Sequence, residues 1–140
     1  MPKFVVAALL LLTCACRTIQ TEDDERPVLD VQSGGEIQLA AGETARVTES
    51  SVRITFTGVR EDSRCPGDVT CVWAGNAAVR LSLRDANSAA LDTVVNTGIE
   101  PRVIGFLAYS IGVAGLLPVP KSGQPIKSEN YRVTLKVNAR

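Results

Sequence analysis

The sequence predicts an all-β fold, a small antiparallel β-sandwich or barrel-like domain of about seven to eight strands with one short disulfide loop. Two segments, 52–59 and 131–138, alternate between apolar and polar residues, which is the pattern of half-buried strands. Glycine, proline, asparagine and aspartate residues separate such segments at the spacing typical of small sandwiches and barrels. After residue 16, no segment has the periodicity of a long amphipathic helix.

Residues 1–16 have the composition of an export signal. Lys3 supplies a positive start, and the apolar run 4–12 is far shorter than the roughly 20 residues that a membrane-spanning helix needs. Cysteines follow this run directly, a pattern that resembles a bacterial lipobox, in which a cysteine is lipidated and becomes the mature N-terminus. Ordinary cleavage near Ala15, which would give a secreted or periplasmic protein, is the alternative. Either route places the rest of the chain in an oxidising compartment.

Two cysteines compete for the lipid. Cys16 is favoured because Ala15, a small residue that suits the signal peptidase, directly precedes it, although Thr13 is unusual upstream of it. Cys14 is the alternative, since Leu11 stands at its preferred upstream position, but Thr13 directly before it is unfavourable. We therefore expect the lipid to hold the protein to a membrane of the bacterial envelope, on its periplasmic face, with the outer membrane favoured.

Beyond the signal, the chain divides into a flexible polar tether, 17–35, and a single β-domain, 36–140. The tether includes the acidic cluster 22–25, has no hydrophobic periodicity and ends in two glycines. Further strands of the domain are expected at 36–40, 44–47 and 89–96.

Residues 103–120 form an uncharged run whose length is marginal for a membrane span. This run contains three glycines and two prolines, and residues 109–114 alternate between larger and smaller side chains. We therefore expect one or two buried strands with a proline-rich exit. A membrane span and an exposed apolar patch that meets a partner or a bilayer are the alternatives.

Cys65 and Cys71 are the only cysteines outside the export signal, so we expect them to form a disulfide. A redox-active pair is disfavoured, because such cysteines usually lie closer in sequence at a helix N-terminus, whereas a strand is expected here. Metal binding by these cysteines with Asp62 and Asp68 is also disfavoured. The chain has no histidine, and its carboxylates lack the spacing of a calcium loop. We expect no metal and no cofactor.

The only tryptophan, Trp73, lies between the second cysteine and an alternating segment. If residues 71–84 form one strand, Trp73 shares a face with the apolar residues of the second half of that strand, and it then points into the core beside the disulfide. A bulge at Gly75 would reverse this parity and turn Trp73 outward, where it would become a binding residue. We favour the inward orientation.

The segment EDSRCPGDVTCVWAGNAAVRL, residues 61–81, resembles a motif of an uncharacterised family of bacterial secreted proteins and lipoproteins. The matching positions are Asp62, Ser63, Arg64, Cys65, Pro66, Cys71, Trp73, Gly75 and Ala77. The likeness extends over 36–137 and includes the segment FTGV before the motif and a Pro-x-Pro segment before the last strand. It implies a small β-domain with a short disulfide loop, and it implies no activity and no ligand residue.

Composition argues against two large classes of function. The formal net charge is zero and aromatic residues are scarce, so we do not expect nucleic-acid binding. The chain has no histidine, no Gly-x-Ser-x-Gly elbow and no glycine-rich phosphate or dinucleotide loop. We therefore expect no catalytic residues and no enzymatic activity.

These observations together predict a non-enzymatic envelope lipoprotein that binds an envelope protein or a cell-wall partner, or has a structural role. The candidate binding residues are the charged side chains on the rim of the disulfide loop: Arg60, Asp62, Arg64 and Asp68. One alternative is a periplasmic protein that binds a small ligand or a metal through residues 60–76. Another is an inhibitor that presents the rigid disulfide loop to an extracellular enzyme.

Overall fold

A computed structural model describes residues 26–140 of the chain. The expected export signal, with its candidate lipidation sites Cys14 and Cys16, lies outside the described residues, as does the first part of the expected tether. The last part of the segment expected as a flexible tether belongs to the folded domain instead. Residues Leu29–Val31 form the edge strand β1, which pairs in parallel with β3.

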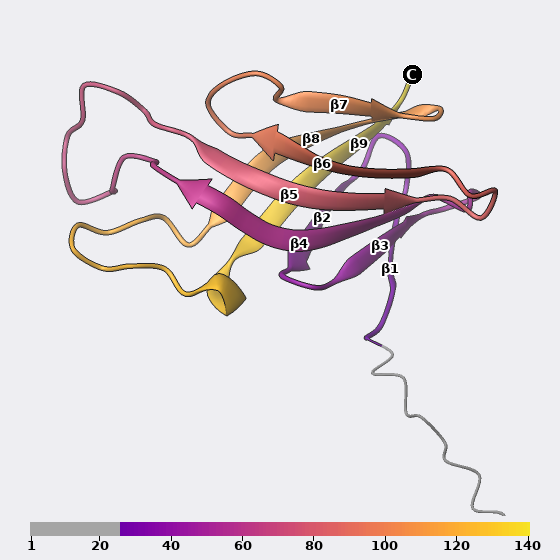
Figure 1. The fold of residues 1–140 in the computed structure, drawn as a ribbon, viewed down its shortest axis with the longest axis horizontal. Coiled ribbons are helices and arrows are strands. Elements are labelled where there is room, and N and C mark those ends of the chain that lie inside the picture. The colour runs from indigo at the N-terminus through magenta and orange to yellow at the C-terminus, as the bar shows by residue number, and fades with distance from the viewer. Residues whose placement is uncertain (1–25) are drawn as a thin grey trace, which may run out of the picture.

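The described chain folds into two stacked β-sheets (Figure 1), which confirms the all-β sandwich. The five-stranded sheet has the order β1 (Leu29–Val31), β3 (Thr44–Val47), β4 (Arg53–Asp62), β5 (Ala77–Arg84) and β6 (Ala90–Asn96). The four-stranded sheet has the order β2 (Glu36–Ala40), β9 (Arg132–Ala139), β8 (Tyr109–Leu117) and β7 (Val103–Phe106). Within residues 26–140, all the strand pairs except β1–β3 are antiparallel, and the single 3₁₀ turn, η1, covers Ser128–Asn130.

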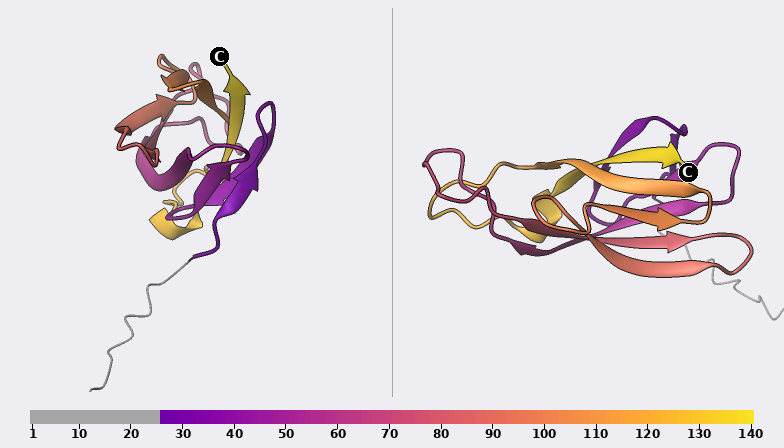
Figure 2. Two further views of the ribbon diagram at one scale, coloured as in Figure 1. Left: turned by 90° about the vertical axis from the view of Figure 1, so that its right-hand side faces the viewer. Right: turned by 90° about the horizontal axis from the view of Figure 1, so that it is seen from above.

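The core lies between the two sheets, which the left view of Figure 2 shows nearly along the strands. Its side chains come from alternate positions of the strands, because successive residues of a strand point to opposite faces. The largest fully buried side chains include Phe56 and Ile54 of β4, Leu81 and Leu83 of β5, Ile111 of β8 and Leu135 of β9. The alternation expected for 52–59 and 131–138 is therefore confirmed, and it identifies the central strands of both sheets.

The uncharged run 103–120 forms a hairpin at the edge of the four-stranded sheet. β7 and β8 pair in antiparallel register, and β8 contributes Ile111 and Leu116 to the core. The register shifts between Val113 and Gly115, where the strand bulges. This agrees with the expectation of buried strands followed by a proline-rich exit. Within residues 26–140, no helix is long and apolar enough to cross a membrane.

Two long loops project from the same end of the sandwich (Figure 1; right view of Figure 2). One loop, 63–76, connects β4 to β5 and contains both cysteines. The other, 118–131, connects β8 to β9 and contains η1. We refer to these two loops together as the disulfide end.

Candidate functional site

The disulfide predicted between Cys65 and Cys71 is present, with the two Cα atoms 5.9 Å apart. The N–H of Cys65 donates to the carbonyl of Ala74 at 3.0 Å, so the ladder of β4 and β5 continues into the base of the loop. The disulfide closes the loop above this hydrogen bond. The cysteines therefore hold the shape of a loop that strand pairing has already brought together.

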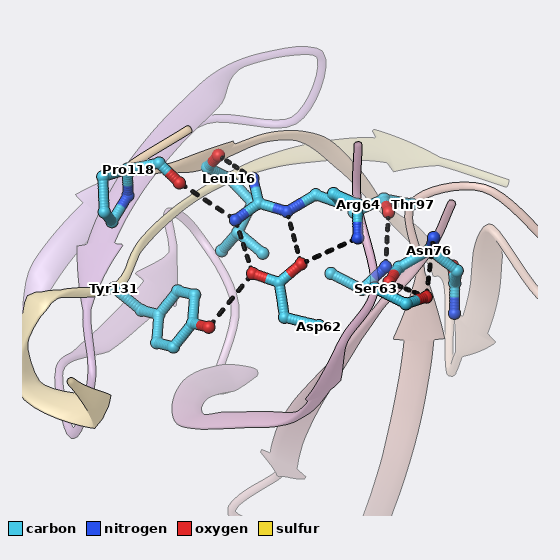
Figure 3. A network of polar contacts seen from close by, with 9 residues as sticks. Asp62, Ser63, Arg64, Asn76, Thr97, Leu116, Pro118 and Tyr131 are labelled. Carbon is cyan, nitrogen blue, oxygen red and sulfur yellow. Dashed lines mark hydrogen bonds and ion pairs between the residues drawn. The ribbon is translucent and has the colours of Figure 1, made fainter. Parts of the chain in front are cut away.

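At the base of this loop, Asp62 and Arg64 form an ion pair with two parallel contacts (Figure 3). Nε of Arg64 donates to Oδ1 of Asp62 at 2.8 Å, and one terminal nitrogen donates to Oδ2 at 2.6 Å. The Arg64 side chain is only 14% exposed and the Asp62 side chain only 10%. Such a two-point pair is stronger and more specific in geometry than a single charged contact.

The Arg64 guanidinium also connects the loop to the opposite sheet. Its remaining N–H groups donate to the carbonyls of Leu116 at 2.6 Å and Pro118 at 2.9 Å, where β8 ends (Figure 3). Tyr131, just before β9, donates its hydroxyl to Oδ2 of Asp62 at 3.0 Å. This cluster of three side chains, which we call the Asp–Arg–Tyr cluster, therefore joins β4, β8 and the start of β9.

The ionisation of the cluster follows from burial and from these contacts. Burial by itself would raise the pKa of Asp62, but the hydrogen bonds and charge of Arg64 outweigh it and hold that pKa below its usual value. Burial, together with the hydrogen bond to the Asp62 carboxylate, raises the pKa of Tyr131 to about 12. At neutral pH the cluster therefore consists of a carboxylate, a guanidinium and a neutral phenol.

A second set of hydrogen bonds fixes the returning half of the loop. Ser63 and Asn76 bond to each other three times, and the shortest of these bonds joins Ser63 N–H to the Asn76 carbonyl at 2.7 Å. The Asn76 side chain bonds to Oδ1 of Asn96 at 2.9 Å and accepts from the N–H of Gly98 at 2.9 Å. The loop is therefore attached to the end of β6 as well as to β8.

The inward placement expected for Trp73 is wrong. β5 begins at Ala77, and residues 71–76 are not part of a strand. Gly75 has a φ of +74°, and a Cβ there would collide with the carbonyl of Ser63, so the chain turns at this glycine and the odd–even parity is lost. Trp73 is 81% exposed and Val72 is 95% exposed. The alternative, a bulge at Gly75 that turns the indole outward, gives the orientation found, although residues 71–76 form no strand that could bulge.

The disulfide loop also contacts the loop beside it. Gly67 N–H donates to the carbonyl of Pro120 at 2.9 Å, and the Asp68 carboxylate accepts from the N–H of Ser122 at 2.9 Å. The exposed apolar side chains of the two loops and the adjacent strand end are Val69, Val72, Trp73, Leu117 and Val119. The disulfide end therefore presents apolar side chains on a backbone that is braced from several sides.

The four residues predicted as a charged rim divide into two pairs. Asp62 and Arg64 belong to the Asp–Arg–Tyr cluster, so their side chains are engaged inside the protein rather than offered on a rim. Arg60 and Asp68 are exposed. Arg60 forms one ion pair, with Glu61 at 3.4 Å, and the Asp68 carboxylate accepts a hydrogen bond from the N–H of Ser122. The predicted rim consists of charged residues, whereas the most exposed large apolar side chains of residues 26–140 are Val72 and Trp73 in the same loop.

The rest of the chain gives no direct lead to an activity. Among residues 26–140, no three histidine, cysteine, aspartate or glutamate side chains are grouped so that they could hold a metal ion. Comparison of the chain with family models, with curated proteins and with solved structures finds no match. The function is therefore argued from the geometry of the disulfide end.

Proposed function

We propose that this chain is a non-enzymatic, membrane-tethered envelope lipoprotein that binds a protein partner through the disulfide end. The lipid anchor is supported by the lipobox-like pattern that ends at Cys16, or alternatively Cys14. The partner-binding role is supported by one observation above all. Trp73, the only tryptophan of the chain, is 81% exposed in a loop that is held by a disulfide and by the Asp–Arg–Tyr cluster.

An exposed tryptophan on a braced loop favours a protein partner for two physical reasons. Tryptophan is among the residues that contribute most to binding when they enter a pocket of a partner. A loop that is already ordered also loses little conformational entropy when it binds. Isolated apolar residues on a surface need no explanation, but Val72 and Trp73 are adjacent and are both strongly exposed in the bend that follows Cys71.

A small-molecule ligand fits the disulfide end less well. The hollow nearest to the loop tips is about 210 Å³ and is lined by residues of loop 118–131, among them Val119 and Ile126. Pockets for drug-sized ligands are usually about 300–1,000 Å³. The disulfide loop projects from the end of the sandwich (Figure 1) and is braced, which suits insertion into a partner. The same geometry would suit an inhibitor of an extracellular enzyme, and the identity of the captured partner distinguishes the two roles.

Site-specific photo-cross-linking tests the partner-binding role. We would place a photoreactive amino acid at Val72, which is 95% exposed and leaves Trp73 in place, or, as a control, at Asn87, which is exposed in the turn between β5 and β6. The expected result in native membranes is a defined adduct from position 72 and none from position 87. Unlabelled wild-type chain should compete this adduct away, whereas unlabelled Trp73→Ala chain should not. The same adducts from both positions, or equal competition by both chains, would contradict the proposal.

Membrane fractionation tests the anchor separately. Changing both Cys14 and Cys16 to serine should move the protein from the membrane fraction to the soluble fraction, because neither site then accepts a lipid. The single variants identify which cysteine is lipidated, and Cys16→Ser is expected to have the full effect. A double variant that still fractionates with the lipid would overturn the lipoprotein part of the proposal and leave the test of Trp73 unaffected.

A further inference from the structure

On the outer face of the five-stranded sheet, three arginines lie directly opposite one another on neighbouring strands. Arg46 of β3 is in register with Arg53 of β4, and Arg53 is in register with Arg84 of β5. All three residues are exposed, and Figure 1 shows their strands side by side. Like charges directly opposite each other destabilise a strand pair. A row of three such residues, which we call the arginine row, is therefore unfavourable for the sheet in the absence of an anion.

The two outer arginines have carboxylate partners on the flanking strands. Arg46 bonds to Asp30 of β1 at 2.8–2.9 Å, and Arg84 bonds to Asp92 of β6 at 2.9–3.1 Å. The arginine side chains of these two pairs are about half exposed, and such surface pairs typically contribute only about 0–1 kcal/mol. The outer guanidiniums can therefore turn toward a bound anion at little loss of stability.

Arg53, in the middle of the row, is different. In the part of the chain that the structure describes, its guanidinium makes no hydrogen bond or ion pair, and its two in-register neighbours are both arginines. The residue is exposed and lines a hollow beside the row. Arginine presents these donors in a planar fork that matches two oxygens of a phosphate or carboxylate.

The arginine row also lines a hollow of about 200 Å³, together with Ser51, Asp85 and Ala86. The Asp85 carboxylate lies in this hollow, but it already accepts hydrogen bonds from the Ser51 hydroxyl and from the N–H of Asn87. Three guanidiniums and one carboxylate therefore line the hollow. A small oxyanion could contact several guanidinium groups there at once.

We propose that the arginine row, Arg46, Arg53 and Arg84, is a binding site for a phosphate group, with Arg53 as its central donor. The phosphate is either free inorganic phosphate or the phosphodiester of an anionic lipid headgroup, since both present the same oxygens to a guanidinium fork. This site lies on the sheet face and does not depend on the function proposed for the disulfide end.

The test uses the full chain in a non-ionic detergent and three probes at constant ionic strength. The probes are inorganic phosphate, dihexanoyl phosphatidylglycerol and, as a lipid with the same acyl chains but no phosphate, dihexanoylglycerol. Chemical shifts of the arginine Nε–H groups report the titration. Saturable shifts of Arg53 with inorganic phosphate but not with phosphatidylglycerol identify free phosphate, and tighter binding of phosphatidylglycerol identifies the lipid headgroup. No saturable shift with either phosphate-containing probe, or equal binding of dihexanoylglycerol, overturns the proposal.

Two variants make the test specific to the row. Arg53→Gln should weaken binding by about tenfold or more, because a charge-assisted fork is replaced by a neutral amide. Arg80→Gln is the matched control, since Arg80 is exposed on the same sheet face of β5 but lies opposite Gly58 and Val94 rather than an arginine. Equal weakening by both variants would show a general charge effect and contradict the assignment.

Thermal unfolding gives a second readout that does not rely on the chemical shifts. Without ligand, Arg53→Gln should unfold at a temperature equal to or above that of the wild type, because it removes like-charge repulsion. Phosphate should raise the unfolding temperature of the wild type and of Arg80→Gln, but not that of Arg53→Gln. An Arg53→Gln protein that is destabilised, or that phosphate stabilises as much as the wild type, would overturn the proposal.

Discussion

The Asp62 carboxylate and the Arg64 guanidinium form a two-point ion pair at 2.8 Å and 2.6 Å across the base of the disulfide loop. The pair lies where β4 ends, and Arg64 extends it to two carbonyls at the end of β8. One charged pair thereby fixes the loop to both sheets. Asp62 and Arg64 therefore have a structural role: they hold in place the loop that exposes Val72 and Trp73.

We expect Arg64→Lys to destabilise the protein by roughly 2–3 kcal/mol, although the charge is kept. A lysine ammonium cannot hold the two-point contact with Asp62 and also reach the carbonyls of Leu116 and Pro118. Urea denaturation measures the change in the free energy of unfolding. Arg60→Lys is the control, because Arg60 is exposed and the change there should stay within about 0.5 kcal/mol. Equal stabilities of the two variants would show that Arg64 acts only as a surface charge.

Because of Asp62, the free energy of unfolding should decrease as the pH becomes acidic. Its pKa in the folded state lies below that of an unfolded aspartate, about 3.9, so its carboxylate stabilises the fold at neutral pH. This contribution should be present above about pH 4 and should be lost as the pH falls through the folded-state pKa. In denaturation series from neutral to acidic pH, Asp62→Asn should be less stable at pH 7 and should show a shallower loss on acidification.

Asp68→Asn is the control for this pH dependence. The N–H of Ser122 hydrogen-bonds to Asp68 and holds the pKa of that carboxyl below its usual value as well, but the side chain is exposed. Solvent screening should therefore leave its effect on stability small. The role assigned to Asp62 is wrong if Asp68→Asn flattens the acid dependence as much as Asp62→Asn does.

We expect the double variant Cys65→Ser, Cys71→Ser to lose about 2 kcal/mol of stability while it keeps the fold. The closed loop is short, so its cross-link removes only a modest amount of entropy from the unfolded chain. The Asp–Arg–Tyr cluster and the hydrogen bonds between Ser63 and Asn76 remain to hold the base of the loop. Denaturation measures the loss, and the cross-link from position 72 should weaken at the same time. Complete unfolding of the double variant would show that the disulfide, rather than the cluster, organises this end.

Alternation predicted the central strands because it depends on one physical fact, that neighbouring residues of a strand face opposite sides of the sheet. The buried positions Ile54 and Phe56, and later Val133 and Leu135, follow that rule. The disulfide was equally predictable, because Cys65 and Cys71 are the only cysteines outside the expected export signal. Both inferences need only local sequence and composition.

The inward orientation of Trp73 failed because parity holds only while the backbone stays extended. Gly75 adopts a positive φ, and nothing in the neighbouring sequence requires that conformation. β1 was missed for another reason: a three-residue parallel edge strand is too short to show any periodicity. The arginine row could not be predicted either, because it depends on the register of three strands that are separated along the chain.

The exposure of Trp73 gives a spectroscopic prediction, because this residue is the only tryptophan. We expect the folded protein to emit close to the wavelength of free tryptophan in water, with little further red shift on unfolding. Trp73→Ala should change the free energy of unfolding by less than about 0.5 kcal/mol, as is usual for an exposed side chain. Ile54→Val, which removes one methylene from the core, should cost about 1 kcal/mol and serves as the positive control. A blue-shifted emission that moves to the red on unfolding, together with a larger loss for Trp73→Ala than for Ile54→Val, would place the indole in the core and remove the basis for partner binding at this loop.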